Sequence, residues 1–202
     1  MIFLRYEGFR SYLKLYPITV AILAINIALF VYDFWLGGDH YFIRNGVLLV
    51  DPYTDYFSFD EPWRYVTSIF LHGGFDHLLF NCFAILVFAP PLERILGKFN
   101  YAFFYLFAGI MGNACTALLE TDTISSLGAS GAIYGVYGIY LYLALFKKAM
   151  DEGSRRTVYT ILIFGIIASL LSPNTNVWAH LGGAIAGFGF GFLYDKVLNT
   201  RK

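Results

Sequence analysis

Two residues that could act as a nucleophile and its base lie in glycine-rich stretches of this sequence. Ser130 lies in GASG (128–131), which opens an uncharged segment at 123–146, and His180 lies in AHLGG (179–183). A serine hydroxyl beside an imidazole is the minimum unit of an activated nucleophile, because the imidazole accepts the serine proton and later returns it to a leaving amine. The alternative interpretation of the first stretch is a small-residue face for helix contact in a membrane.

The glycines predict that these two segments pack together. Gly183 and Gly187 share a helical face with His180 and form a GxxxG pair, which lets another helix backbone approach closely. The obvious partner is the glycine face of the segment at 127–146, formed by Gly131, Gly135 and Gly138. If these faces meet, His180 lies at about the same depth as Ser130.

No acidic third member of a triad is evident near either residue, since Asp195 lies about four turns beyond His180. Tyr134 lies one turn below Ser130 on the same helical face, where its ring could support the imidazole. A packing aromatic without a role in chemistry is the alternative for Tyr134.

A second polar cluster, HGGFDHLLFN (72–81), begins another apolar segment. His77 and Asn81 are i, i+4 neighbours, so their side chains point the same way. As donors they could hold the anionic oxygen of a tetrahedral intermediate together with the Ser130 N–H. The competing interpretation is a metal site built on His72, His77 and His180. We disfavour it because the nearby carboxylate, Asp76, would point away from His77 on a helix.

The composition indicates an integral membrane protein. Of the 202 residues, 58% are hydrophobic and only 14% are charged, whereas soluble domains carry about 25% charged residues. The net charge of zero argues against a nucleic-acid partner. Cys82 and Cys115 both fall in apolar runs without metal-binding spacing, so we interpret them as small hydrophobic residues.

The hydropathy pattern predicts one all-α domain over 1–202 with six membrane spans. These are expected at 17–36, 75–92, 99–119, 127–146, 157–171 and 177–198. A long outer loop at 37–74 should contain short elements of its own. The uncharged part of the second span, His77–Leu92, is short for a full crossing, which suggests local thinning of the bilayer or a start inside a wet cavity.

The basic residues predict the orientation. Six spans put both termini on one side of the membrane, and of the 14 lysines and arginines only Arg44 and Arg64 lie on the other side. The positive-inside rule therefore places both termini in the cytoplasm.

With these features in place, the sequence resembles the rhomboid intramembrane serine proteases. The resemblance rests on four motifs in the family's order: Trp63-Arg64, the segment 72–81, the segment 128–131, and the segment 179–183 followed by Gly187. Each motif is weak alone. Four in order, each at the outer end of its predicted element, are specific.

The resemblance implies a Ser130–His180 dyad without an aspartate, and an oxyanion hole made of His77, Asn81 and the Ser130 amide. It also implies supporting residues, which are Tyr134 stacked under His180, Gly128 and Gly131 beside the nucleophile, a structural His72, Trp63 and Arg64 shaping the first loop, and Glu93 tying cytoplasmic loops. Phe80 and the fifth span would form the lateral entrance for a substrate helix.

The expected function is an intramembrane serine endopeptidase that cleaves single-span membrane proteins near the outer face of a bacterial plasma membrane. Its expected partners are the lipid bilayer and transmembrane-helix substrates, and no cofactor, metal or nucleic acid is expected. One alternative is a non-catalytic rhomboid-like protein for binding or quality control. A small transporter or channel is disfavoured, because the polar groups gather at one depth near the outer face.

Overall fold

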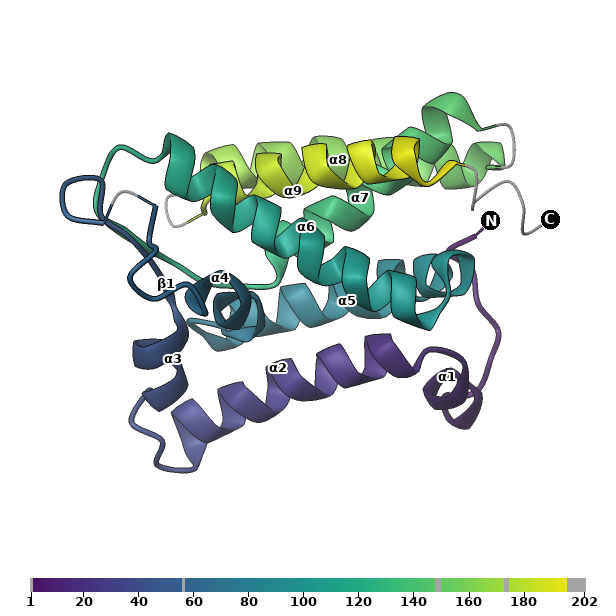
Figure 1. The fold of residues 1–202 in the computed structure, drawn as a ribbon. Helices are drawn as coiled ribbons and strands as arrows, with labels where there is room; N and C mark the ends of the chain where they lie inside the picture. The colour runs from purple at the N-terminus through teal and green to yellow at the C-terminus, as the bar shows by residue number, and fades with distance from the viewer. Residues whose placement is uncertain (1, 56, 148–149, 173–174, 196–202) are drawn as a thin grey trace.

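The computed structural model describes residues 2–55, 57–147, 150–172 and 175–195. Within these residues, six long helices run side by side (Figure 1): α2 (Pro17–Trp35), α5 (Phe75–Leu96), α6 (Lys98–Leu119), α7 (Ser130–Phe146), α8 (Glu152–Leu171) and α9 (Val177–Leu193). The shorter elements are α1 (Phe9–Leu15), α3 (Tyr41–Gly46), β1 (Leu48–Val50), α4 (Arg64–Thr67), the 3₁₀ helix η1 (Ser68–Phe70) and β2 (Ile124–Ser126).

The long helices make this an integral, multi-pass membrane protein. Four of them, α2, α5, α6 and α8, are long and apolar enough to cross a membrane. The apolar helices α7 and α9 have 17 residues each, at the lower limit for a crossing. The count of six spans therefore stays a prediction.

The helices alternate in direction, so the bundle has two distinct ends. Figure 1 shows α1 at the end where α2, α6 and α8 begin, and α3, β1 and α4 at the opposite end. Ser130 and His180 both lie in the first turns of helices that begin at this second end, as the sequence predicts.

Helix α5 is longer than the predicted second span, which we ended at residue 92. It has 22 residues and continues through Glu93 to Leu96, so the expectation of a short span was wrong. The charge of Glu93 does not end the helix because its side chain is buried in protein, with 2% of its surface exposed.

One of the two prolines inside α5, Pro90, leaves a backbone carbonyl without its helical donor, and the N-terminal segment supplies other donors. Pro90 has no N–H, so the carbonyl of Leu86 loses its intrahelical donor. The guanidinium Nη2 of Arg5 donates to this oxygen at 2.8 Å, and the Tyr12 hydroxyl donates to it at 3.3 Å. Residues from another segment therefore satisfy the carbonyl that Pro90 leaves without a donor.

The prediction of an all-α fold was incomplete, because two short strands pair ahead of α7. β1 and β2 are antiparallel, with Leu48 opposite Ser126 and Val50 opposite Ile124. Leu48 and Val50 are fully buried, so the strand is held by packing as well as by its hydrogen bonds. The loop at 37–74 thus contains its own elements, as expected, and one of them is joined to the residues that lead into Ser130.

Other predicted span boundaries also shift. α7 begins at Ser130 instead of residue 127, because Gly128 has a φ of 129°, outside the helical region. α8 begins at Glu152 instead of residue 157, where the Asp151 side chain accepts a hydrogen bond from the Ser154 N–H. The described part of the last span ends with α9 at Leu193, and residues 196–198 of the prediction lie outside the described residues.

The predicted contact between the two glycine faces is confirmed. A Cβ atom added to Gly183 would lie 2.0 Å from the carbonyl oxygen of Gly131, and one added to Gly187 would lie 1.9 Å from that of Gly135. No side chain fits in such a space, so the backbones of α7 and α9 touch directly. The same packing brings Gly131, next to Ser130, against Ala179, next to His180.

Glu93 joins the last turn of α5 to the first turn of α2. Its carboxylate accepts hydrogen bonds from the Ile18 and Thr19 N–H groups at 3.0 and 2.9 Å, and from the Thr19 hydroxyl at 2.7 Å. A negative charge at a helix N-terminus is also favoured by the helix dipole.

We predict that Glu93→Gln destabilises the protein by about 2–3 kcal/mol, because a neutral amide replaces a buried, charge-assisted acceptor of three hydrogen bonds. Thermal unfolding in detergent micelles measures this. Glu152→Gln is the control, because the Glu152 side chain is exposed and paired with the exposed Arg156, and it should cost less than about 1 kcal/mol. Equal losses in the two variants would contradict the assigned role of Glu93.

Candidate active site

Ser130 is the first residue of α7 and is partly exposed. The turn before it is anchored by a hydrogen bond from the Gly128 N–H to the Ser68 carbonyl at 2.9 Å. A Cβ atom on Gly128 would lie 2.7 Å from Nε2 of His77 and 3.9 Å from Oγ of Ser130. The absence of a side chain at Gly128 therefore lets the His77 imidazole approach the nucleophile candidate.

His180 lies at the same end of α7. Its imidazole stacks on the Tyr134 ring with a centroid separation of 4.0 Å and an interplanar angle of 11°. Tyr134 is one turn along α7 from Ser130, and the two helices touch where Gly131 meets the Ala179 carbonyl. These contacts hold the imidazole over the face of α7 that carries Ser130.

The structure adds one residue that our sequence analysis missed. Oγ of Ser169, in the last turn of α8, lies 2.7 Å from Nδ1 of His180 and 2.9 Å from the Tyr134 hydroxyl. A serine near the end of an apolar span is a polar residue in a costly place, and this signal in the sequence could have identified Ser169.

His77 and Asn81 lie together on α5. The Asn81 side-chain amide donates to the His77 carbonyl at 2.9 Å, which leaves its second N–H for another acceptor. The His72 ring packs edge-on against the His77 ring at 5.1 Å and is 2% exposed. The structure thus places His77 beside the Ser130 turn, with His72 packed against it.

The Ser130 hydroxyl forms no hydrogen bond with another of the residues that the structure describes. Hydrogen bonds between catalytic groups are often long before substrate binds. Proton transfer from Ser130 to His180 therefore belongs to the proposal below.

Trp63 and Arg64 join elements of the first loop. The Trp63 indole N–H donates to the Asn45 carbonyl at 3.1 Å. The buried Arg64 guanidinium donates to the Glu61 carboxylate at 2.6 Å and to the Val47 carbonyl at 2.7 Å. These contacts connect α4 to the chain on both sides of β1, which suits the predicted role of shaping this loop.

The Phe80 side chain points away from the bundle interior and is 72% exposed. Its assignment to a lateral entrance stays a prediction. In the described part of the chain, no group of three or more histidine, cysteine, aspartate or glutamate side chains is arranged to hold a metal ion.

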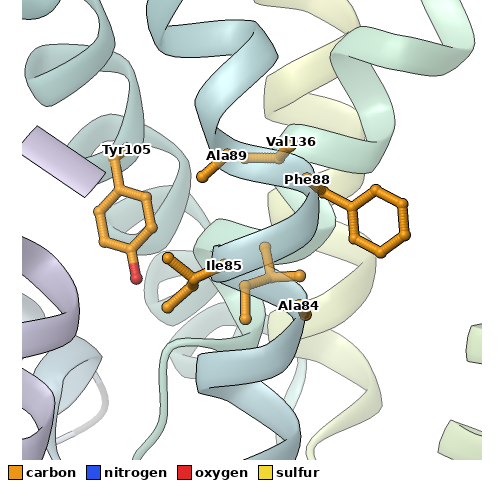
Figure 2. A pocket seen from close by; sticks show the side chains of 7 residues that line it. Ala84, Ile85, Phe88, Ala89, Tyr105 and Val136 are labelled. Atoms are coloured by element: carbon orange, nitrogen blue, oxygen red, sulfur yellow. The ribbon is translucent and has the colours of Figure 1, made fainter. Parts of the chain in front are cut away.

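A hollow deeper in the bundle has a different character (Figure 2). It lies between α5, α6 and α7 and is lined by Ala84, Ile85, Phe88, Ala89, Tyr105, Ile133 and Val136. Six of these seven side chains are apolar and the seventh is the phenol of Tyr105. None of them is a candidate catalytic residue. The candidate site lies instead at the end of the bundle where α5, α7 and α9 begin.

Comparison with known proteins agrees with these observations. The rhomboid domain family matches residues 60–196, a range that contains all the candidate site residues. The "Putative rhomboid protease YdcA" of Bacillus subtilis is 38% identical over 195 residues, which is 95% of each chain.

Two longer proteins match the same region. "RHOMBOID-like protein 6, mitochondrial" of Arabidopsis thaliana is 34% identical over 66% of this chain and 44% of its own length. "Rhomboid protease GluP" of B. subtilis is 38% identical over 63% of this chain and 25% of its own. The family match and the near full-length relative show that this chain belongs to the rhomboid family.

Proposed function

We propose that the protein is an intramembrane serine endopeptidase in which Ser130 is the nucleophile and His180 the general base. The observation that carries this proposal is the position of the His180 imidazole. The imidazole is stacked on Tyr134, which lies one turn from Ser130, and its Nδ1 is hydrogen-bonded to Oγ of Ser169. The protease names of relatives from B. subtilis support the same class of activity.

In the proposed reaction, Oγ of Ser130 attacks the scissile carbonyl while Nε2 of His180 takes its proton. The negative charge that develops on the carbonyl oxygen is held by the Ser130 N–H and by side-chain donors of His77 and Asn81. His180 then returns the proton to the leaving amine, and water releases the acyl group from Ser130.

The proposed substrates are single-span membrane proteins cut near the outer face. In a helical substrate the scissile carbonyl is engaged in an intrahelical hydrogen bond. The cleaved region should therefore contain residues that weaken a helix, such as glycine or proline. The proposed orientation has cytoplasmic termini. It is supported by the charge asymmetry of the sequence, and α1 and the last turn of α9 lie at the same end of the bundle (Figure 1). The B. subtilis relatives support a bacterial plasma membrane.

The test is cleavage of a single-span model substrate by purified protein in liposomes, with a serine-reactive fluorophosphonate as a second readout. The wild type should cleave the substrate and carry the label on Ser130, and Ser130→Ala should do neither. If the wild type neither cleaves several substrates nor is labelled, the non-catalytic binding function replaces this proposal.

We further predict that Asn81→Ala lowers kcat by about 10²–10³-fold with little change in KM, since the donor acts mainly on the oxyanion. Asn100→Ala is a matched control, because Asn100 makes the same kind of hydrogen bond, to the carbonyl four residues earlier, on α6. Steady-state cleavage kinetics distinguish the two. An Asn81→Ala enzyme with wild-type kcat would remove Asn81 from the oxyanion hole.

A further inference from the structure

We infer that Ser169 is a positioning residue that holds His180 in the tautomer required of a base. This inference rests on the proposed function, in which His180 accepts the Ser130 proton. The role is the one an aspartate plays in a catalytic triad, where it orients the imidazole through Nδ1. Here the group is a neutral hydroxyl on a different helix, α8.

The hydrogen-bond donors can be assigned by elimination. A serine hydroxyl has one hydrogen to donate and two lone pairs. Oγ of Ser169 lies 2.8 Å from the Gly165 carbonyl oxygen, which can only accept, so the Ser169 hydrogen is directed there. Both lone pairs then face donors, which are the Tyr134 hydroxyl and Nδ1–H of His180.

This assignment determines which nitrogen of His180 is free. With Nδ1 protonated and bonded to Ser169, the neutral ring has its lone pair on Nε2. A base at Nε2 is what the proposed reaction needs. Without an acceptor at Nδ1, both tautomers would be populated and the ring could rotate on Tyr134.

Gly165 makes room for this network. A Cβ atom at Gly165 would lie 2.6 Å from the Tyr134 hydroxyl oxygen, so any side chain there would force α8 and Tyr134 apart. The Tyr134 ring has little freedom to move away, because it also stacks on the His180 imidazole and packs edge-on against the Tyr137 ring. The glycine and the serine, one turn apart on α8, thus act as a pair.

A hydroxyl suits this position for an electrostatic reason. Ser169 is 6% exposed in a helix long and apolar enough to cross a membrane. A carboxylate in this place would carry a large desolvation penalty. A hydroxyl orients the imidazole by the same geometry without burying a charge.

The experiment measures both the tautomer and the rate. In protein labelled with ¹⁵N-histidine, the His180 resonances, assigned by their loss in His180→Ala, should show a single Nδ1–H tautomer in the wild type and a mixture in Ser169→Ala. For cleavage, Ser169→Ala should lower kcat about tenfold, the equivalent of one hydrogen bond, with KM unchanged. Ser169→Thr keeps the hydroxyl and should restore both readouts. Ser172→Ala, an exposed serine one turn further on, should alter neither.

Gly165→Ala provides a second variant, because it disturbs the network while leaving the Ser169 hydroxyl in place, and it should also mix the tautomers. An unchanged His180 spectrum in both variants would overturn the assignment of Ser169. The spectrum does not depend on turnover. If Ser169→Ala mixes the tautomers but the wild type never cleaves a substrate, the role of Ser169 in holding the tautomer is supported and the proposed function is rejected.

Discussion

Ser130→Ala is expected to lower kcat for cleavage of a single-span substrate by about 10⁵–10⁶-fold, and His180→Ala by a similar factor. Removal of the nucleophile or the base has an effect of this size in serine proteases because the two groups act as one unit. For the same reason, the double variant should be no slower than either single variant. Single-turnover cleavage in liposomes gives the rates.

Ser11→Ala is the control for this experiment, since Ser11 is exposed on α1. This variant should cleave the substrate at the wild-type rate. Additive losses in the double variant would indicate that Ser130 and His180 act in separate steps. Wild-type rates in Ser130→Ala would show that another group attacks the carbonyl, and the proposed dyad would be wrong.

The second large effect is expected at the contact between α7 and α9. Gly187→Ala would place a methyl group 1.9 Å from the Gly135 carbonyl oxygen. Neither backbone can yield without separating the helices, so we predict a loss of about 3 kcal/mol or more in the free energy of unfolding. The change is also expected to remove cleavage, since separating α7 from α9 would displace His180 relative to Ser130.

Gly189→Ala is a matched control on the same helix, because a Cβ atom there meets nothing within 4 Å. It should leave stability unchanged or raise it by about 0.5–1 kcal/mol, since alanine favours helix over glycine. Unfolding in mixed detergent micelles measures both variants. Similar stabilities for Gly187→Ala and Gly189→Ala would mean that the close backbone contact does not hold the bundle together.

Several features could be predicted from the sequence because their causes are local. The glycine spacing at Gly183 and Gly187 required a close helix partner whatever the rest of the fold. The polar residues in apolar segments, such as His77 and Asn81, needed partners away from lipid. The low charge and the order of the four motifs pointed to the rhomboid family, which the comparisons show.

Other features depend on distances between segments that are remote in sequence. The pairing of β1 with β2 brings Leu48 opposite Ser126, and nothing in either short stretch specifies the other. The extension of α5 past Glu93 depends on donors in the first turn of α2.

The sequence by itself determined the membrane class, the family, and the helices that carry Ser130 and His180. Helix periodicity and the cost of burying polar groups act within a single segment, so these features can be predicted from the sequence of that segment. Only the tertiary structure decided that Ser169 lies against Nδ1 of His180 and that Gly165 leaves space for Tyr134. These contacts depend on how α8 packs against α7 and α9, which no periodicity within α8 encodes.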